Sequence, residues 1–196
     1  MRLYDNPISG NCYKIRLFLA LIGKEYESIP VDSVHGETRQ PHFLAISPRG
    51  LIPVLEDNGE VIADSMAILV YLARRYAPKW LPDGPLAMAR VMEWLAIAAD
   101  ELQHGAAQAR RIKKLGAPGN LTQAQMHAEH GLSLLEKRLE NHNWLSDIKP
   151  TIADIACYPY VALAPEGGVP LDPYPPIRDW MERIRRLPGY VPMDGL

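Results

Sequence analysis

The first third of the chain alternates short apolar runs with an amphipathic stretch. Apolar side chains recur at the i, i+3, i+4, i+7 spacing of a helix face at Ile15, Phe18, Leu19 and Ile22. Gly23 marks the expected end of this helix. Residues 2–4 and 26–31, on either side, suit strands. The order strand, helix, strand near the start of the chain therefore predicts a parallel βαβ unit.

A hairpin and a further helix follow. Residues 53–63 hold two apolar runs separated by Asn58-Gly59, which is a strong hairpin signal because both turn positions need a positive φ. The apolar spacing over residues 65–76 predicts a helix. A short helix is expected near residues 40–45, in the connection before the hairpin. The expected order is thus βαβ, a connection, and ββα.

The rest of the chain reads as helical. Residues 78–85 are rich in proline and are expected to form a linker. Helices are predicted at residues 86 to 114, from 122 onward, at 152–164 and around 177–184. Capping boxes are expected to open two of them, Thr122 with Gln125 and Thr151 with Asp154. The predicted fold is an α/β domain over residues 1–77 and an all-α domain over residues 86–196.

Composition narrows the functional classes. The chain has 196 residues, 47% of them hydrophobic, and a net charge of −2, so intrinsic disorder and a strongly basic nucleic-acid binder are both disfavoured. Two cysteines are too few for a disulfide framework or a four-cysteine zinc site, and His127 with His130 lacks further metal ligands. No apolar run approaches the length of a membrane span. We expect a soluble cytoplasmic protein without a metal, a nucleic-acid partner or a membrane partner.

The predicted start of the first helix carries candidate chemistry. Unpaired N–H groups and a positive potential collect at a helix N-terminus, where Ser9 or Asn11 could donate a hydrogen bond to a thiolate. Taken alone, this segment is better explained by Ser9 or Asn11 acting as an ordinary N-cap. Cys12 is either a nucleophile with a lowered pKa or a small buried apolar residue.

Two further pairs of residues are candidates for binding. Ile52-Pro53 precedes the hairpin, and a cis bond there would turn the Ile52 backbone groups outward, although most such bonds are trans. Asp64-Ser65 precedes a helix, where Ser65 either caps the helix or binds a carboxylate. Each pair taken alone has an ordinary structural explanation.

Together these motifs resemble those of the glutathione S-transferase family, and the resemblance covers essentially the whole chain. The matching stretches are SGNCYKIR at residues 9–16, SPRGLIPVLED at 47–57, ADSMAIL at 63–69 and TIAD at 151–154. The resemblance is to serine-type, theta-like members, with bacterial members similar in length and in the Ser-Gly-Asn-Cys start. It implies a thioredoxin-like domain that binds glutathione as co-substrate, a helical domain that lines the electrophile site, and a homodimer.

The resemblance also implies roles for particular residues. Ile52, with Leu51 and a cis Pro53, would pair with the cysteinyl backbone of glutathione. Asp64 and Ser65 would hold the γ-glutamyl end, although the family more often has Glu or Gln where Asp64 stands. Arg39 is a plausible partner for the glycyl carboxylate, without a motif to anchor it. Candidates for the electrophile pocket are His104, Arg111, Tyr158 and Tyr160.

The expected activity is transfer of glutathione to a small electrophile. Ser9 matches the hydroxyl of serine-type members and would stabilise the glutathione thiolate, whereas Tyr4 lies near the tyrosine of tyrosine-type members. Asn11 and Cys12 remain alternatives for this role. Two other functions stay open, a cysteine-based thiol reductase and a non-catalytic ligand-binding or regulatory protein. A basic run at Arg110, Arg111, Lys113 and Lys114 either complements a helix dipole or meets an anionic substrate.

Overall fold

The computed structural model describes residues 1–193, so the last three residues of the expected helical domain lie outside the described chain. The N-terminal part contains four strands, β1 (Arg2–Asp5), β2 (Glu27–Pro30), β3 (Val54–Asp57) and β4 (Glu60–Ala63). They form one sheet in the order β2-β1-β3-β4. β1 pairs parallel with β2 and antiparallel with β3, and β4 is antiparallel to β3. This topology confirms the predicted βαβ–ββα order.

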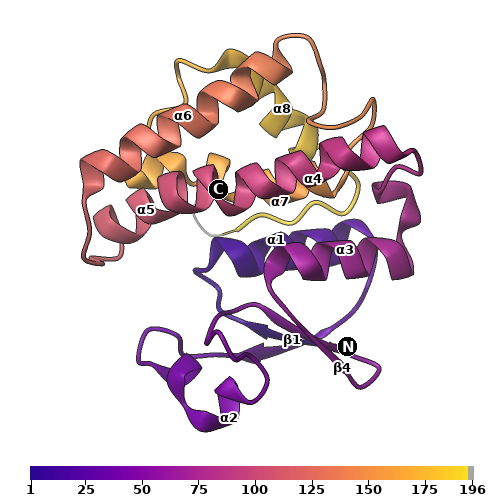
Figure 1. The fold of residues 1–196 in the computed structure, drawn as a ribbon, viewed down its shortest axis with the longest axis vertical. Coiled ribbons are helices and arrows are strands. Elements are labelled where there is room, and N and C mark those ends of the chain that lie inside the picture. Colours follow the sequence, from indigo (N-terminus) through magenta and orange to yellow (C-terminus); the bar gives the residue numbers. More distant parts are fainter. Residues whose placement is uncertain (194–196) are drawn as a thin grey trace.

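Two helices cover the inner face of the sheet. α1 (Gly10–Leu21) and α3 (Ser65–Tyr76) lie between the sheet and the helical domain, whereas α2 (Pro41–Leu44) lies on the other side of the sheet (Figure 1). The outer face has a small core of its own, in which Phe43 packs with Val31 and Val54. The predicted short helix in the connection is therefore present, preceded by the 3-10 turn η1 (Glu37–Arg39).

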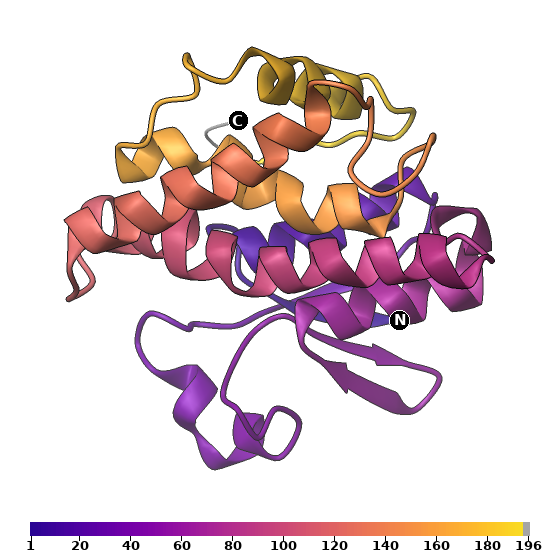
Figure 2. The same ribbon diagram turned by 45° about the horizontal axis from the view of Figure 1, so that its top comes forward.

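The second part of the chain is helical, as predicted. Its elements are η2 (Pro78–Trp80), α4 (Pro85–Ala99), η3 (Gln103–Ala107), α5 (Gln108–Lys113), α6 (Leu121–Leu139), α7 (Ile152–Ala162), η4 (Ala164–Gly167) and α8 (Pro175–Arg185). Figure 2 shows this helical layer above the sheet domain, where α4 packs against α7 and α6 packs against η3. No helix within residues 1–193 is long and apolar enough to cross a membrane.

Two local predictions for the helical part were wrong. The expected single helix over residues 86–114 is divided, because α4 ends at Ala99 and the π-helical turn η3 leads into α5. At this turn a side chain on Gly105 would lie within about 2.6 Å of the Ala128 backbone, so α6 packs directly on η3. The cap of α6 is Asn120, whose Oδ1 accepts from the Gln123 N–H at 3.0 Å, and not Thr122. Asparagine is as good a cap as threonine and stands two positions earlier.

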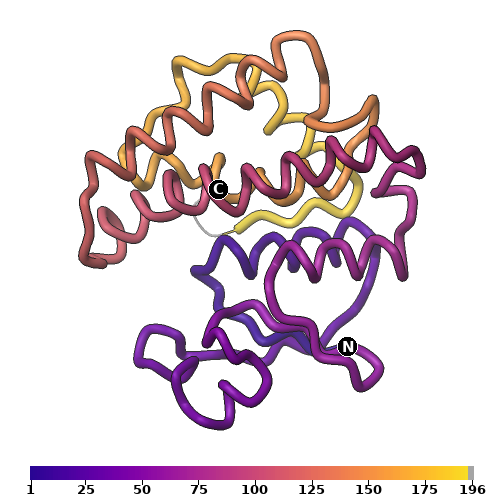
Figure 3. The backbone as a smooth tube through the Cα atoms, viewed as in Figure 1, coloured from indigo at the N-terminus to yellow at the C-terminus, as the bar shows by residue number. Residues whose placement is uncertain are grey.

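One hydrophobic core joins the sheet domain to the helical domain. Buried side chains of α1 and α3 belong to the same cluster as those of α4, α6 and α7. The extended segment after α8 returns between α1 and the helical layer (Figure 3). There the Tyr13 hydroxyl donates to the Val191 carbonyl at 2.7 Å. The two domains are therefore held against each other, and the groups at their boundary have fixed relative positions.

Candidate functional site

Ser9 is the N-cap of α1. Its extended backbone (φ −81°, ψ 120°) ends the loop after β1, and its Oγ accepts from the Cys12 N–H at 3.2 Å. A hydroxyl that accepts this bond still has its own proton to donate. Ser9 lines an open cavity. The cap therefore leaves a hydroxyl donor at the positive end of a helix, facing the space where a ligand would lie.

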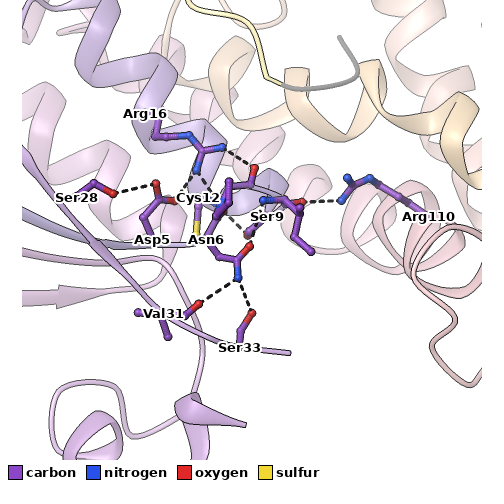
Figure 4. A network of polar contacts seen from close by, with 11 residues as sticks. Asp5, Asn6, Ser9, Cys12, Arg16, Ser28, Val31, Ser33 and Arg110 are labelled. Carbon is purple, nitrogen blue, oxygen red and sulfur yellow. Dashed lines mark hydrogen bonds and ion pairs between the residues drawn. The ribbon is translucent and has the colours of Figure 1, made fainter. Parts of the chain in front are cut away.

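The loop that carries Ser9 is held from both sides (Figure 4). The Asn6 amide donates to the Val31 carbonyl at 3.1 Å and to Ser33 Oγ at 3.2 Å. Its Oδ1 accepts from the Ile8 N–H at 3.1 Å. Arg16 of α1 donates to Asp5 at 2.5 Å and to the carbonyls of residues 6 and 7. These bonds pre-organise the loop, and sequence reasoning had not singled out Asn6.

The helical domain also holds this loop. Arg110 of α5 donates from Nη1 to the Ile8 carbonyl at 2.8 Å and from Nε to Glu166 at 2.5 Å. Lys114 also pairs with Glu166. Burial opposes ionisation of Glu166, but the hydrogen bonds from Lys114 and Arg110 outweigh it and hold the pKa of Glu166 below its usual value. Arg110 is 4% exposed, so it is a buried structural link and not part of a solvated basic run.

The main cavity lies at the boundary of the two domains and has a volume of about 500 Å³. Its walls come from the Ser9 loop, the segments around η1 and residue 50, α5 with the following loop, and Tyr160 of α7. The predicted site residues that it brings together are Ser9, Arg39, Leu51, Ile52 and Arg111. A larger open groove on the far side of α1, lined by Arg16 and Tyr26 among others, holds none of the predicted site residues.

A smaller cavity adjoins the main one, because the two share Leu51 and Ile52. The predicted residues Asn11, Pro53, Asp64 and Ser65 line it, together with Ser47, Arg49 and Ala63. The two cavities together are lined by every predicted glutathione-binding residue.

The Ile52–Pro53 bond is cis. Ser47 holds the segment before it, since its Oγ accepts from the Leu51 N–H at 3.2 Å and donates to the Leu51 carbonyl at 2.9 Å. Within the described chain the backbone N–H and C=O of Ile52 have no hydrogen-bond partner. These two groups are therefore free to pair with the backbone of a bound peptide.

Asp64, and not Ser65, is the N-cap of α3. Asp64 has the left-handed φ of +86°, which is strained for a residue other than glycine. Its Oδ1 accepts from the Met66 N–H at 2.8 Å, and its Oδ2 accepts from Arg49 at 3.2 Å. Ser65, at the first position of the helix, is 6% exposed and lines the smaller cavity. Since Asp64 performs the capping, the Ser65 hydroxyl and the helix N-terminus are available for a carboxylate.

Cys12 is completely buried in the core. Burial raises the pKa of its thiol to about 12, against a smaller lowering effect of the hydrogen bond with Ser9. A thiol with this pKa is almost entirely protonated near pH 7 and is a poor nucleophile. The environment supports the interpretation of Cys12 as a small packing residue.

The four residues expected at the electrophile pocket lie in different environments. Arg111 lines the main cavity. His104 is exposed on η3, 3.8 Å from Asp100, and is not among the lining residues. Tyr158 is fully buried, with its hydroxyl 2.9 Å from that of Tyr190. Tyr160, two residues further along α7 and also a candidate, lines the main cavity.

Lys14 is a fully buried lysine beneath the site. Its Nζ donates to Asn11 Oδ1 at 2.8 Å and lies 5.2 Å from the centre of the Tyr160 ring. The Asn11 amide in turn donates to Gln103 of η3 at 3.2 Å. Burial lowers the pKa of Lys14 to about 8. The orientation of the Asn11 side chain is therefore set by one group from each domain.

Replacing Lys14 with methionine is expected to raise the free energy of unfolding at pH 7 by about 3 kcal/mol, because the folded state no longer holds a buried ammonium. In the natural protein the unfolded chain binds a proton at Lys14 that the folded chain loses between about pH 8 and 10. Stability from this residue therefore rises with pH across that interval. Urea unfolding at both ends of the interval measures the effect. A K14M protein with the same pH slope as the natural protein would contradict the assignment.

Comparison with known proteins agrees with this geometry. The family model described as "Glutathione S-transferase, N-terminal domain" matches residues 1–74, and the model described as "Glutathione S-transferase, C-terminal domain" matches residues 122–188. A crystal structure of a glutathione S-transferase from Pseudomonas fluorescens superposes with a TM-score of 0.93 at 37% identity, covering 98% of each chain.

Two curated relatives have different activities in their names. Maleylacetoacetate isomerase from Pseudomonas aeruginosa is 34% identical over 188 residues, which cover 91% of this chain and 88% of that protein. Disulfide-bond oxidoreductase YfcG from Escherichia coli is also 34% identical, over 95% of this chain and 91% of that protein. The similarity therefore establishes a family while leaving the individual reaction to be argued from the site.

Proposed function

Because the chain belongs to the glutathione S-transferase family, whose substrate is glutathione, we propose that it is a glutathione transferase in which Ser9 activates the thiol. The observation that carries the proposal is the Ser9 hydroxyl at the N-terminus of α1. Its oxygen accepts from the Cys12 N–H, which leaves its proton to donate into the cavity. The serine-type assignment of the sequence motif and the position of the hydroxyl support the same role.

The residues along the two cavities suggest how glutathione lies. The γ-glutamyl end is assigned to Asp64 and Ser65 at the start of α3, where the helix N-terminus favours a carboxylate. The cysteinyl backbone is assigned to the unpaired N–H and C=O of Ile52. The glycyl carboxylate is assigned to Arg39, which packs beside Gly50 just ahead of Leu51. This pose places the thiol next to Ser9.

The interactions at Ser9 are strong enough to lower the pKa of the glutathione thiol by the amount needed. A cysteine-like thiol with a pKa of about 8.5 is only about 3% ionised at pH 7, and lowering that pKa by about 2 units needs about 2.7 kcal/mol. A hydrogen bond to a charged group contributes about 1.5–3 kcal/mol, and a helix terminus adds about 0.3–1 kcal/mol. Ser9 together with the N-terminus of α1 is therefore sufficient.

The proposed reaction is a nucleophilic attack by the thiolate. The thiol proton passes to solvent, the sulfur electron pair forms a bond to an electrophilic carbon, and the leaving group departs with its own bonding pair. Binding both reactants side by side in the main cavity supplies proximity. Asn11 is assigned to the wall of the smaller cavity and not to thiol activation, because its side-chain amide already accepts from Lys14 and donates to Gln103. A reductase that uses Cys12 receives no support, because that thiol is buried and protonated.

A pH titration of bound glutathione tests this proposal. Thiolate ultraviolet absorbance is followed with saturating glutathione, and the spectrum of the protein alone is subtracted. The expected apparent pKa is about 6.5, two units below the free thiol. A Cys12→Ala protein serves as control and should give the same curve. Saturable binding with an unshifted pKa would exclude thiol activation, and the absence of binding would exclude the transferase itself.

We also propose that the protein works in the cytoplasm as a homodimer. Both cysteines are free thiols, as a reducing compartment requires, and apolar side chains such as Val61 on β4 and Met92 on α4 remain exposed in the single chain. Sedimentation equilibrium measures the oligomeric state directly.

A further inference from the structure

The charged side chains that line the main cavity are all positive. Its lining includes three arginines and no aspartate or glutamate, although the protein as a whole carries a net charge of −2. A cavity with one sign of charge concentrates ligands of the opposite sign.

The three arginines are not equivalent. Arg110 is buried, and its guanidinium is already engaged by Glu166 and the Ile8 carbonyl. Arg39 comes from the glutathione-binding domain and lies beside Gly50, on the wall assigned to the glycyl carboxylate. Arg111 comes from α5 on the opposite wall. Its guanidinium donates to Gln108 at 3.3 Å, and within residues 1–193 it forms no other side-chain hydrogen bond and no salt bridge.

The same cavity gathers apolar side chains that the fold leaves exposed. Ile8, Val34, Leu51 and Leu115 are between 41% and 68% exposed, and all four line it. Leu115 lies one turn after Arg111, next to Ala117. The helical wall therefore combines an unpaired guanidinium with apolar contacts, which suits a ligand with an apolar body and an anionic end.

We propose that the electrophile carries a carboxylate, which Arg111 binds, while its apolar body packs on Leu115, Ile8 and Tyr160. This inference rests on the proposed transferase function and adds a substrate class to the same site. Arg111 acts as a specificity residue, because it contacts the second substrate and not the reacting sulfur. Two anionic reactants then occupy the cavity, with Arg39 and Arg111 neutralising one carboxylate each.

A matched pair of electrophiles tests the substrate class. 4-Chloro-3-nitrobenzoate and 4-chloro-3-nitrobenzamide have the same ring and leaving group, and one end is an anionic carboxylate in the first and a neutral amide in the second. In both, the glutathione sulfur forms a bond to the ring carbon, chloride leaves with the bonding pair, and the thiol proton passes to solvent. Dividing each enzymatic kcat/KM by the uncatalysed rate constant removes the difference in intrinsic reactivity. The natural protein is expected to favour the carboxylate about ten-fold.

Three variants test whether the preference for the carboxylate depends on Arg111 or on the positive charge of α5 as a whole. Arg111→Gln should abolish the ten-fold preference, and Arg111→Lys should retain part of it. Lys113→Gln removes a charge from the same helix at a residue outside the cavity lining, and should keep the full preference. Equal rates for both electrophiles in the natural protein, or a preference that survives Arg111→Gln, would overturn the proposal.

Binding measurements make the result independent of turnover. Calorimetry compares glutathione with its S-(4-carboxy-2-nitrophenyl) conjugate and the corresponding carboxamide conjugate. The carboxylate conjugate should bind about ten-fold more tightly than the carboxamide, and only in proteins that retain Arg111. If Arg111→Gln weakens glutathione itself to the same degree, Arg111 belongs to the glycyl carboxylate and the inference is overturned. If glutathione does not bind the natural protein, it is the transferase function that fails.

Discussion

Replacing Ser9 with alanine is expected to lower kcat/KM for conjugation by about 10- to 100-fold near pH 7, which corresponds to the loss of one hydrogen bond to a thiolate. The apparent pKa of bound glutathione should rise by about 1 to 2 units. At a pH above the pKa of the free thiol, glutathione is ionised without help, so the two proteins should differ much less there. Rates measured across this pH range report on thiol activation and not merely on folding.

Two further variants define the origin of the effect. Ser9→Thr retains a hydroxyl and should recover much of the activity, whereas Cys12→Ala alters a core thiol and should leave the pH profile unchanged. Ser9 also caps α1, so Ser9→Ala is expected to lower the free energy of unfolding by about 1 kcal/mol. A decrease in rate that is the same at all pH values would indicate a purely structural role for Ser9.

Replacing Asp154 with alanine is expected to lower the free energy of unfolding by about 3–5 kcal/mol. Asp154 is completely buried, and burial raises the pKa of its carboxyl above the usual value. Its oxygens accept from the Leu145 N–H at 3.0 Å, the Thr151 N–H at 2.9 Å and the Trp180 indole at 2.9 Å. The variant leaves all three donors buried without a partner, which is the source of the large penalty.

A graded series tests this interpretation by urea unfolding. Asp154→Asn keeps one oxygen acceptor and should lose less stability than Asp154→Ala. Thr151→Ala removes the N-cap bond to the Ala153 N–H and should cost about 1 kcal/mol. Equal losses for the three proteins, or a loss below about 1 kcal/mol for Asp154→Ala, would show that the network contributes little.

Features that depend on a few neighbouring residues followed from the sequence. Asn58 and Gly59 adopt positive φ values of 53° and 83° in the hairpin turn, because asparagine tolerates the left-handed region and glycine has no Cβ. Thr151 and Asp154 form the expected capping box. The βαβ–ββα order and the all-helical second part followed from apolar spacing in the same way. Such features are local, since the partners lie within one turn of chain and the residue types determine the geometry.

The sequence identified only some of the residues that line the site. The sequence pointed to Ser9, Ile52 and Ser65, because each lies at a junction between elements where backbone groups are left unpaired. It did not distinguish Tyr158 from Tyr160, which lie two residues apart on α7, because the direction of each side chain depends on what packs against the helix. The tertiary structure turns Tyr158 toward Tyr190 and Tyr160 toward the cavity.

Burial and long-range pairing were decided by the tertiary structure alone. Cys12 is unreactive because it is buried in the core. Arg110 pairs with Glu166, 56 residues away in the chain, instead of lying in a solvated basic run. Lys14 is desolvated because α7 closes over α1. The sequence by itself determined most of the elements and their order, because these arise from local backbone preferences and apolar periodicity, but it missed the division of residues 86–114 and the Asn120 cap of α6. Solvent exposure, and with it pKa and reactivity, depends on contacts between distant segments, so only the folded structure decided which of the candidate groups face the cavity.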